Sequence, residues 1–184
     1  MKKYITLLFT GFLISSFAAE IDINGKFVRG MDGWLSPQKK LITEIKTNAK
    51  DRFQLKLGKK DAKQRIMVYS RVYSAGSAGD KITLSAVASG SGAGYVGIAC
   101  FDYGGNQTNI VYRYFYPGKE MKKYTFDVVI PESRRKDRKG NLRKTSKLRI
   151  IFGIQPGASV LFSEVDAIPV IKAQKGSKGV PAGK

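Results

Sequence analysis

The sequence predicts an all-β domain built as a sandwich or a barrel. Short segments rich in β-branched and aromatic residues recur from Ile21 onward, and glycines or prolines separate them. Regularly spaced short strands with such turn signals are typical of sandwiches and barrels. Apolar side chains also occupy every second position between residues 124 and 130, which is the period of a strand with one buried face.

We expect strands at the segments that share this composition. In chain order they cover residues 21–28, 41–47, 53–57, 66–73, 82–88, 95–103, 109–116, 124–130, 148–154 and 160–171. Turn formers such as Gly104-Gly105-Asn106 and Pro156-Gly157 separate neighbouring segments. Helical periodicity is weak in this region, and at most a short turn follows Pro37.

Both ends of the chain differ from this central domain. Residues 1–19 begin with two lysines, continue with an uncharged apolar stretch and end in small residues, the pattern of a cleaved signal peptide. The apolar stretch is shorter than the ~20 residues that span a bilayer. We therefore expect a domain over 20–172 that is secreted, periplasmic or at the cell surface, with no transmembrane segment. Residues 173–184 mix Gly, Ser, Pro, Ala and Lys, which predicts a disordered basic tail.

Composition restricts the chemistry that the chain can perform. It has 33 Lys and Arg against 14 Asp and Glu, a formal charge of +19, which favours anionic partners. Histidine is absent, which excludes Ser-His-Asp and Cys-His triads and histidine metal sites. Cys100 is the single cysteine, so no intrachain disulfide can form, and its apolar neighbours predict a buried thiol.

Four stretches, taken in order, resemble a known family. They are residues 24–27 with Gly33-Trp34, then 78–85, then 121–131, and finally 160–165. Together they are similar to the galactose-binding-like jelly rolls, especially the carbohydrate-binding modules attached to secreted cellulases and xylanases. The resemblance implies a jelly-roll β-sandwich of two antiparallel sheets, with Trp34 as a packing residue.

The resemblance also raises the question of a structural calcium. The family often holds one between an acid near its opening strand and a pair of acids in its closing strand, and calcium needs several oxygen ligands. Here Val28 and Ser163 stand where two of these acids are expected, and Glu164 and Asp166 remain. We therefore expect no metal and no other cofactor.

A row of tyrosines is the first candidate binding site. Tyr112, Tyr114 and Tyr116 share one side of an expected strand, about 6–7 Å apart. Such rings offer apolar area and a hydroxyl, which suits a sugar. Tyr69 and Tyr73, with Tyr95 and Tyr103, could extend the row on neighbouring strands.

The alternation alone leaves open which way this row faces. It could be an exposed platform for a sugar, or it could lie inside the sandwich. In the second arrangement Arg113 and Phe115 would face outward.

The connection over residues 134–147 is the second candidate site. It carries eight basic residues and one acid between two expected strands. Arginine binds sulfate and phosphate through paired donors, so we expect Arg134, Arg135, Arg138 and Arg143 to bind a polyanion. The alternative is a plain solvated loop, since like charges repel and keep such a segment in water.

These features predict a binding protein. The carboxylates are scattered, without the paired spacing that acid–base hydrolysis needs, so we expect no enzyme. The favoured function is a secreted, non-catalytic carbohydrate-binding module, with acidic or sulfated polysaccharide among its ligands. The alternative is a basic envelope or adhesion protein that binds anionic surfaces by charge. Nucleic acid is the least favoured partner.

Overall fold

The computed structural model describes residues 23–48, 52–58 and 63–170. The expected signal segment 1–19 and the expected tail 173–184 lie outside these residues. Within the described part, no helix is long and apolar enough to cross a membrane.

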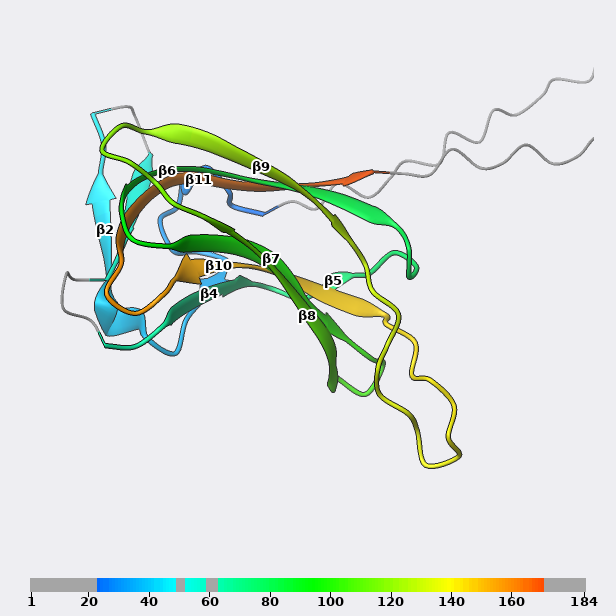
Figure 1. Ribbon diagram of the computed structural model, residues 1–184. Coiled ribbons are helices and arrows are strands. Elements are labelled where there is room, and N and C mark those ends of the chain that lie inside the picture. Colours follow the sequence, from blue (N-terminus) through cyan, green and yellow to red (C-terminus); the bar gives the residue numbers. More distant parts are fainter. Residues whose placement is uncertain (1–22, 49–51, 59–62, 171–184) are drawn as a thin grey trace, which may run out of the picture.

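The protein folds as two antiparallel sheets packed face to face (Figure 1). Sheet A has the order β1-β4-β10-β7-β8, with β5 also paired to β10; its strands are β1 (Trp34–Leu35), β4 (Ile66–Ser70), β5 (Tyr73–Ser74), β7 (Gly94–Phe101), β8 (Gln107–Phe115) and β10 (Lys147–Ile154). Sheet B has the order β2-β3-β11-β6-β9; its strands are β2 (Ile42–Lys46), β3 (Phe53–Leu57), β6 (Lys81–Ser91), β9 (Lys122–Val129) and β11 (Ser159–Val170).

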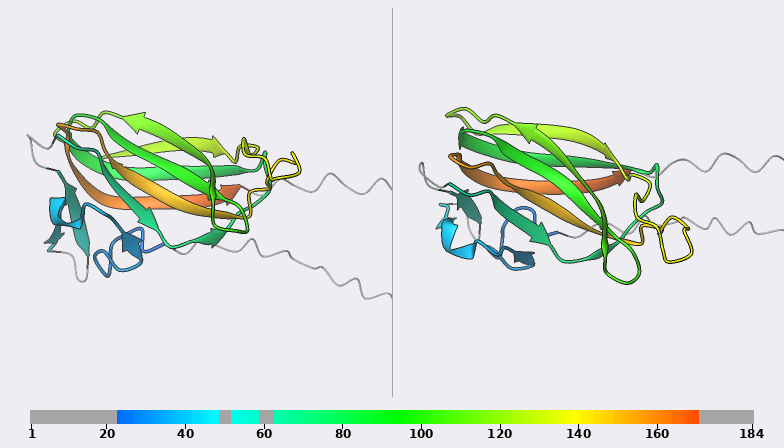
Figure 2. Two further views of the ribbon diagram at one scale, coloured as in Figure 1. Left: turned by 90° about the horizontal axis from the view of Figure 1, so that it is seen from below. Right: turned by 60° about the horizontal axis from the view of Figure 1, so that its bottom comes forward.

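The chain wraps around the sandwich as a jelly roll. From β6 in sheet B it forms the β7–β8 hairpin in sheet A, then β9 in sheet B, β10 in sheet A and β11 in sheet B. Figure 2 shows the two layers from further directions, and its left panel looks from below onto sheet A. The predicted all-β jelly-roll sandwich of two antiparallel sheets is confirmed. A 3-10 turn, Lys39–Leu41, is the one helical element of the described segments.

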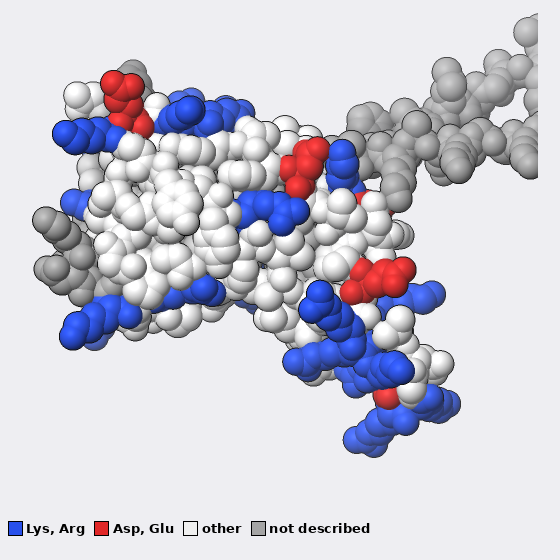
Figure 3. Space-filling view, viewed as in Figure 1, with Lys and Arg blue, Asp and Glu red and all other residues white. Residues whose placement is uncertain are grey.

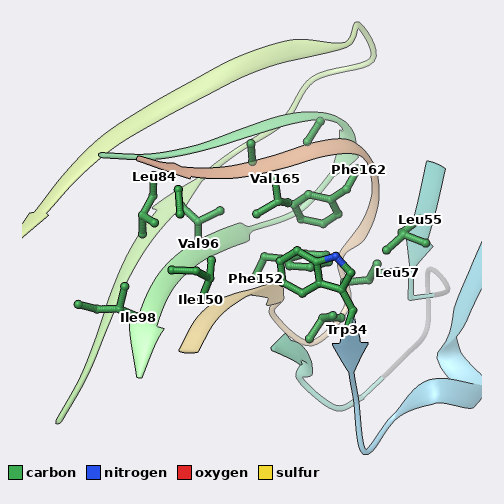
Figure 4. Packing of buried hydrophobic residues seen from close by; sticks show 14 of the residues in the cluster. Trp34, Leu55, Leu57, Leu84, Val96, Ile98, Ile150, Phe152, Phe162 and Val165 are labelled. Atoms are coloured by element: carbon green, nitrogen blue, oxygen red, sulfur yellow. The ribbon is translucent and has the colours of Figure 1, made fainter. Parts of the chain in front are cut away.

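The core fills the space between the sheets (Figure 4). Alternate residues of β10, including Ile150 and Phe152, point inward and are fully buried. Phe152 contacts Trp34 and Phe162, with ring centroids 4.9 Å apart in each pair. Trp34 is 4% exposed, which confirms its predicted packing role. The burial of each such side chain stabilises the fold by roughly 1.5–3 kcal/mol.

Cys100 lies in the same core on β7. It is a free, fully buried cysteine, as the sequence predicts. Burial raises the pKa of its thiol to about 11. The thiol is therefore neutral and unreactive at physiological pH.

The first expected strand, 21–28, is wrong in its described part, because residues from Ile23 form turns. Asn24 donates its side-chain amide to the carbonyl oxygen of Gly30 at 3.0 Å, and Phe27 has a positive φ of 49°. These contacts replace strand pairing. The expected strand 66–73 is also divided, since β4 ends at Ser70 and β5 begins at Tyr73.

Candidate functional site

The outer face of sheet A carries the first candidate site. On β8, Phe115 points into the core and is 4% exposed, so Tyr112 and Tyr114 point outward. This settles the orientation that the sequence left open. Arg113 shares the side of Phe115 but remains exposed, and β8 is the last strand of its sheet.

Tyr95 joins these two rings from β7. Its ring centroid lies 5.1 Å from that of Tyr112 and 6.0 Å from that of Tyr114, and those two centroids are 6.2 Å apart. Tyr114 is 44% exposed, Tyr112 is half-buried, and Tyr95 is fully covered. Tyr95 therefore forms the buried floor of the cluster, and Tyr114 is its accessible ring.

A glycine on β10 makes room for that floor. Tyr95 crosses the strand and donates its hydroxyl to the carbonyl oxygen of Ile66 on β4 at 2.9 Å. A Cβ at Gly153 would lie 2.4 Å from the hydroxyl oxygen, so a side chain there would force its surroundings to shift. Burial, reinforced by Tyr112, raises the pKa of Tyr95 above its ordinary value. Burial also raises the pKa of Tyr112.

The remaining predicted tyrosines lie in different parts of the structure. Tyr69, half-buried on β4, lies on the outer face of sheet A, because its neighbours Val68 and Ser70 are buried. Tyr73 packs against the core, so the structure does not bring it to this face. Tyr116 follows the end of β8, is 77% exposed and lines a hollow beside β9. We call the set Tyr69, Tyr95, Tyr112 and Tyr114 the tyrosine face.

Two arginines that the sequence analysis did not single out lie among these rings. The Cζ atom of Arg65 is 5.6 Å from the ring centroid of Tyr95 and 5.5 Å from that of Tyr112. The Cζ atom of Arg149 is 5.0 Å from the centroid of Tyr69. An arginine inside an otherwise apolar segment, as Arg149 is between Leu148 and Ile150, is the signal that could have identified it.

The basic loop between β9 and β10 forms the second candidate site. It projects from one end of the sandwich, where blue side chains gather at the lower right of Figure 3. A bridge pairs Lys136 with Leu142, and the backbone N–H groups of Lys139 and Asn141 donate to the Asp137 carboxylate. The loop is therefore a folded hairpin.

The predicted polyanion-binding arginines differ in their surroundings. Arg134, Arg135 and Arg138 are exposed. Arg143 instead donates to the carboxylate of Asp102 at 2.5 Å, and the side chain of Asp102 is 8% exposed. This hydrogen bond holds the pKa of Asp102 down at about 2. Arg143 thus fastens the loop to the β7–β8 turn.

The residues around Asn24 offer few ligands for a calcium ion. The amide of Asn24 donates to the carbonyl oxygens of Gly30 and Asp32, both at 3.0 Å, so these oxygens already have a partner. Glu164 and Asp166 line the neighbouring hollow without a third acid. Across the described residues, no group of three or more His, Cys, Asp or Glu side chains is placed to hold a metal.

Comparisons with known proteins support the fold. No protein-family model matches the sequence, and no curated protein matches it. The enzymatically active domain of bacteriophage CBA120 tailspike protein 4 is similar, with a TM-score of 0.58 and 12% identity over 82% of this chain and 21% of that chain. This chain therefore spans about a fifth of that protein.

Two solved carbohydrate-binding structures are also similar. A module described as family 16 carbohydrate-binding module 2 has a TM-score of 0.50 and 12% identity over 79% of this chain and 97% of that one. The CBM22-1 and GH10 modules of Clostridium thermocellum endo-1,4-β-D-xylanase 10B, complexed with xylohexaose, have a TM-score of 0.50 and 12% identity over 78% of this chain and 27% of that one. At the level of the fold, the resemblance to carbohydrate-binding jelly rolls is confirmed.

Proposed function

We propose that this chain is a non-catalytic carbohydrate-binding module that holds a polysaccharide on its tyrosine face. The observation that carries the proposal is the outward row of Tyr112 and Tyr114, supported from below by Tyr95. Tyrosine rings can stack on the apolar faces of sugars while their hydroxyl groups bind sugar hydroxyls. The fold likeness to carbohydrate-binding modules supports this use of the surface.

A non-catalytic role suits the chemistry around the tyrosine face. Hydrolysis of a glycosidic bond usually needs two carboxyl groups on either side of it. None of the strands of sheet A contains an Asp or a Glu. The proposed module therefore binds its glycan on a surface that has no strand carboxylate to act as acid or base.

Acidic or sulfated polysaccharide is the proposed ligand class, and the location is outside the cytoplasm. The formal charge of +19 and the exposed arginines of the basic loop favour an anionic polymer. The same loop supports the second candidate function, a basic envelope or adhesion protein. In that role the loop would bind an anionic surface, and the sandwich would act only as its scaffold.

Alanine substitutions at the tyrosine face test the proposal. Tyr112→Ala and Tyr114→Ala should lower affinity for a bound glycan by about 5- to 30-fold, the loss expected for ~1–2 kcal/mol of aromatic contact. Affinity electrophoresis against a panel of soluble polysaccharides gives the measurement. Tyr103→Ala is the matched control, because Tyr103 is 83% exposed on the β7–β8 turn and has no ring contact with Tyr95, Tyr112 or Tyr114 among the described residues.

Thermal unfolding of the same variants separates binding from packing. Tyr114→Ala should leave the melting temperature almost unchanged, since its ring is substantially exposed. A loss of about 3–5 kcal/mol in unfolding free energy would instead indicate a structural ring. Unchanged glycan affinity in both variants would exclude the tyrosine face as the binding site.

A further inference from the structure

Two arginines on the outer face of sheet A each contact two aromatic rings. Arg149 on β10 lies between Tyr69 of β4 and Phe101 of β7, with its Cζ atom 5.0 and 5.9 Å from the two ring centroids. Arg65, directly before β4, lies over Tyr95 and Tyr112. Contact with ring faces stabilises a guanidinium and restricts its orientation.

Among the described residues, neither guanidinium is paired with a carboxylate. Within the part of the chain that the structure describes, Arg65 makes long hydrogen bonds to neutral acceptors, 3.5 Å to the hydroxyl of Tyr114 and 3.3 Å to the amide oxygen of Gln155. The Nε atom of Arg149 is buried and has no acceptor among the described residues.

The strands of sheet A carry positive charge and no negative charge. Strands of sheet A contain Arg113, Lys147 and Arg149 and no acid. The strand carboxylates, Glu44, Asp127, Glu164 and Asp166, all belong to sheet B. A surface that carries one sign of charge attracts ligands of the opposite sign. Arg113 lies on the side of Phe115, but Lys147 and Arg149 share the outer face of sheet A, which is therefore complementary to an anion.

We propose that Arg65 and Arg149 make the tyrosine face specific for a polysaccharide with anionic substituents, either carboxylates or sulfates. The inference rests on the proposed function, since the rings must hold the sugar chain for the arginines to meet its substituents. A guanidinium presents paired donors that match both oxyanions. The rings hold each guanidinium in place before the ligand arrives, so less side-chain freedom is lost on binding.

Recognition of an anion by Arg65 and Arg149 differs from its attraction by the basic loop. The loop arginines are exposed and follow an anion through general charge, which salt screens strongly. Arg65 and Arg149 lie beside the rings that would contact the sugar. They would therefore meet an anionic substituent on a sugar that is bound to those rings, whereas the loop would attract any anionic polymer through its charge.

The test compares Arg149→Gln and Arg65→Gln on three matched pairs of polymers. The pairs are polygalacturonate and its fully methyl-esterified form, carboxymethyl- and hydroxyethyl-cellulose, and dextran sulfate and dextran. Each variant should lose about tenfold in affinity for the charged member that binds the parent protein, as expected for lost hydrogen bonds to a charged group. Affinity for the neutral partner should change little.

Lys123→Gln is the charge-matched control. Lys123 is exposed on β9 of sheet B, so its loss removes one positive charge far from the tyrosine face. It should change affinity for the charged polymers much less than either arginine variant. Arg149→Lys keeps the charge without the planar donors, so it should also reduce the preference for the charged polymer if the guanidinium is recognised.

Different failures have different meanings. If Arg149→Gln and Arg65→Gln bind the charged polymers as the parent does, while Tyr112→Ala weakens binding, the specificity assignment is wrong and the proposed function stands. Equal losses in the arginine variants and in Lys123→Gln would also overturn the assignment, because the effect would then be general charge. If the parent protein binds no member of any pair, the proposed function itself is wrong for these glycans, and the assignment falls with it.

Discussion

The side chain of Arg143 donates to Asp102 at 2.5 Å, and the carboxylate also accepts the backbone N–H of Asn106 at 2.8 Å. The ionised carboxylate is therefore held by donors from two residues in a site that leaves it 8% exposed. Breaking such a pair leaves one charge without its partner, which is costly in a mostly buried place. Arg143 thus belongs to the folded structure, whereas Arg134 and Arg138 are available to a ligand.

This pair predicts how stability responds to acid. An aspartate has an ordinary pKa of about 3.9, and that of Asp102 is lowered to about 2. A lowered pKa contributes stability that is present above about pH 4 and is lost as the pH falls toward 2. Melting temperatures of Asp102→Asn between pH 6 and pH 2.5 should therefore start lower and decline less steeply than those of the parent.

Asp127→Asn serves as the comparison for that experiment. Asp127 pairs with Lys81 on the surface, where both side chains are about half exposed, 53% and 50% respectively. Exposed ion pairs contribute little. If Asp127→Asn reduces the pH dependence of the melting temperature as much as Asp102→Asn does, the contact between Arg143 and Asp102 stabilises the fold no more than an exposed ion pair.

Individual side-chain roles could be predicted only in part. Trp34 and Cys100 were correctly placed in the core, because large or thiol side chains among apolar neighbours are rarely exposed. The direction of Tyr112 could not be predicted, since alternation fixes which residues share a side of a strand and not which side is covered. The Asp102–Arg143 pair joins residues 41 apart in sequence, and no local pattern indicates it.

At the scale of the strands, local composition was sufficient where pairing is regular. The expected segment 53–57 coincides with β3, and 148–154 differs from β10 by one residue. The two-residue strand β1 was missed, because so short a segment has no periodicity. The expected strand 21–28 was wrong from Ile23 onward. Its apolar residues suggested a strand, but the side chain of Asn24 hydrogen-bonds to the backbone and stabilises a loop.

The crossing of Tyr95 over β10 gives a prediction at this scale. In Gly153→Ala, the new Cβ would lie 2.1 Å from the carbonyl oxygen of Ile66 and 2.4 Å from the hydroxyl of Tyr95. We expect a loss of roughly 1–3 kcal/mol in unfolding free energy, as for other overpacked sites, together with weaker glycan binding as Tyr95 is displaced. Urea unfolding and affinity electrophoresis measure the two effects.

Gly118→Ala is the matched control, because nothing lies within 4 Å of a Cβ at that position. It should leave both stability and binding nearly unchanged. If Gly153→Ala behaves like Gly118→Ala, the floor of the tyrosine face can adjust without cost. The close approach of β10 to Tyr95 would then not position the site.

For the whole molecule, the distribution of charge matters more than its sum. The formal charge of +19 is visible in the sequence, but the separation of acids between the sheets depends on which strands become neighbours. Sheet A combines β4, β7, β8 and β10 from distant parts of the chain, and none of them contains an acid. The sequence therefore predicted an anionic partner, but it could not predict that the strands of sheet A would together lack acidic residues.

The basic loop and the tyrosine face should contribute to binding in different ways, and salt separates them. Arg134, Arg135 and Arg138 are exposed, so replacing all three by glutamine should change unfolding free energy only slightly, by about 0.5 kcal/mol or less at each site. Binding to dextran sulfate should weaken and depend less steeply on salt, because each neutralised anion releases counterions. Affinities measured between 50 and 300 mM NaCl, roughly spanning Debye lengths from above 10 Å to below 8 Å, give the slope. Neutral glycans on the tyrosine face should be unaffected. A triple variant with the parent's salt slope would show that the loop arginines do not meet the polymer, and the lysines elsewhere on the surface would have to account for its charge dependence.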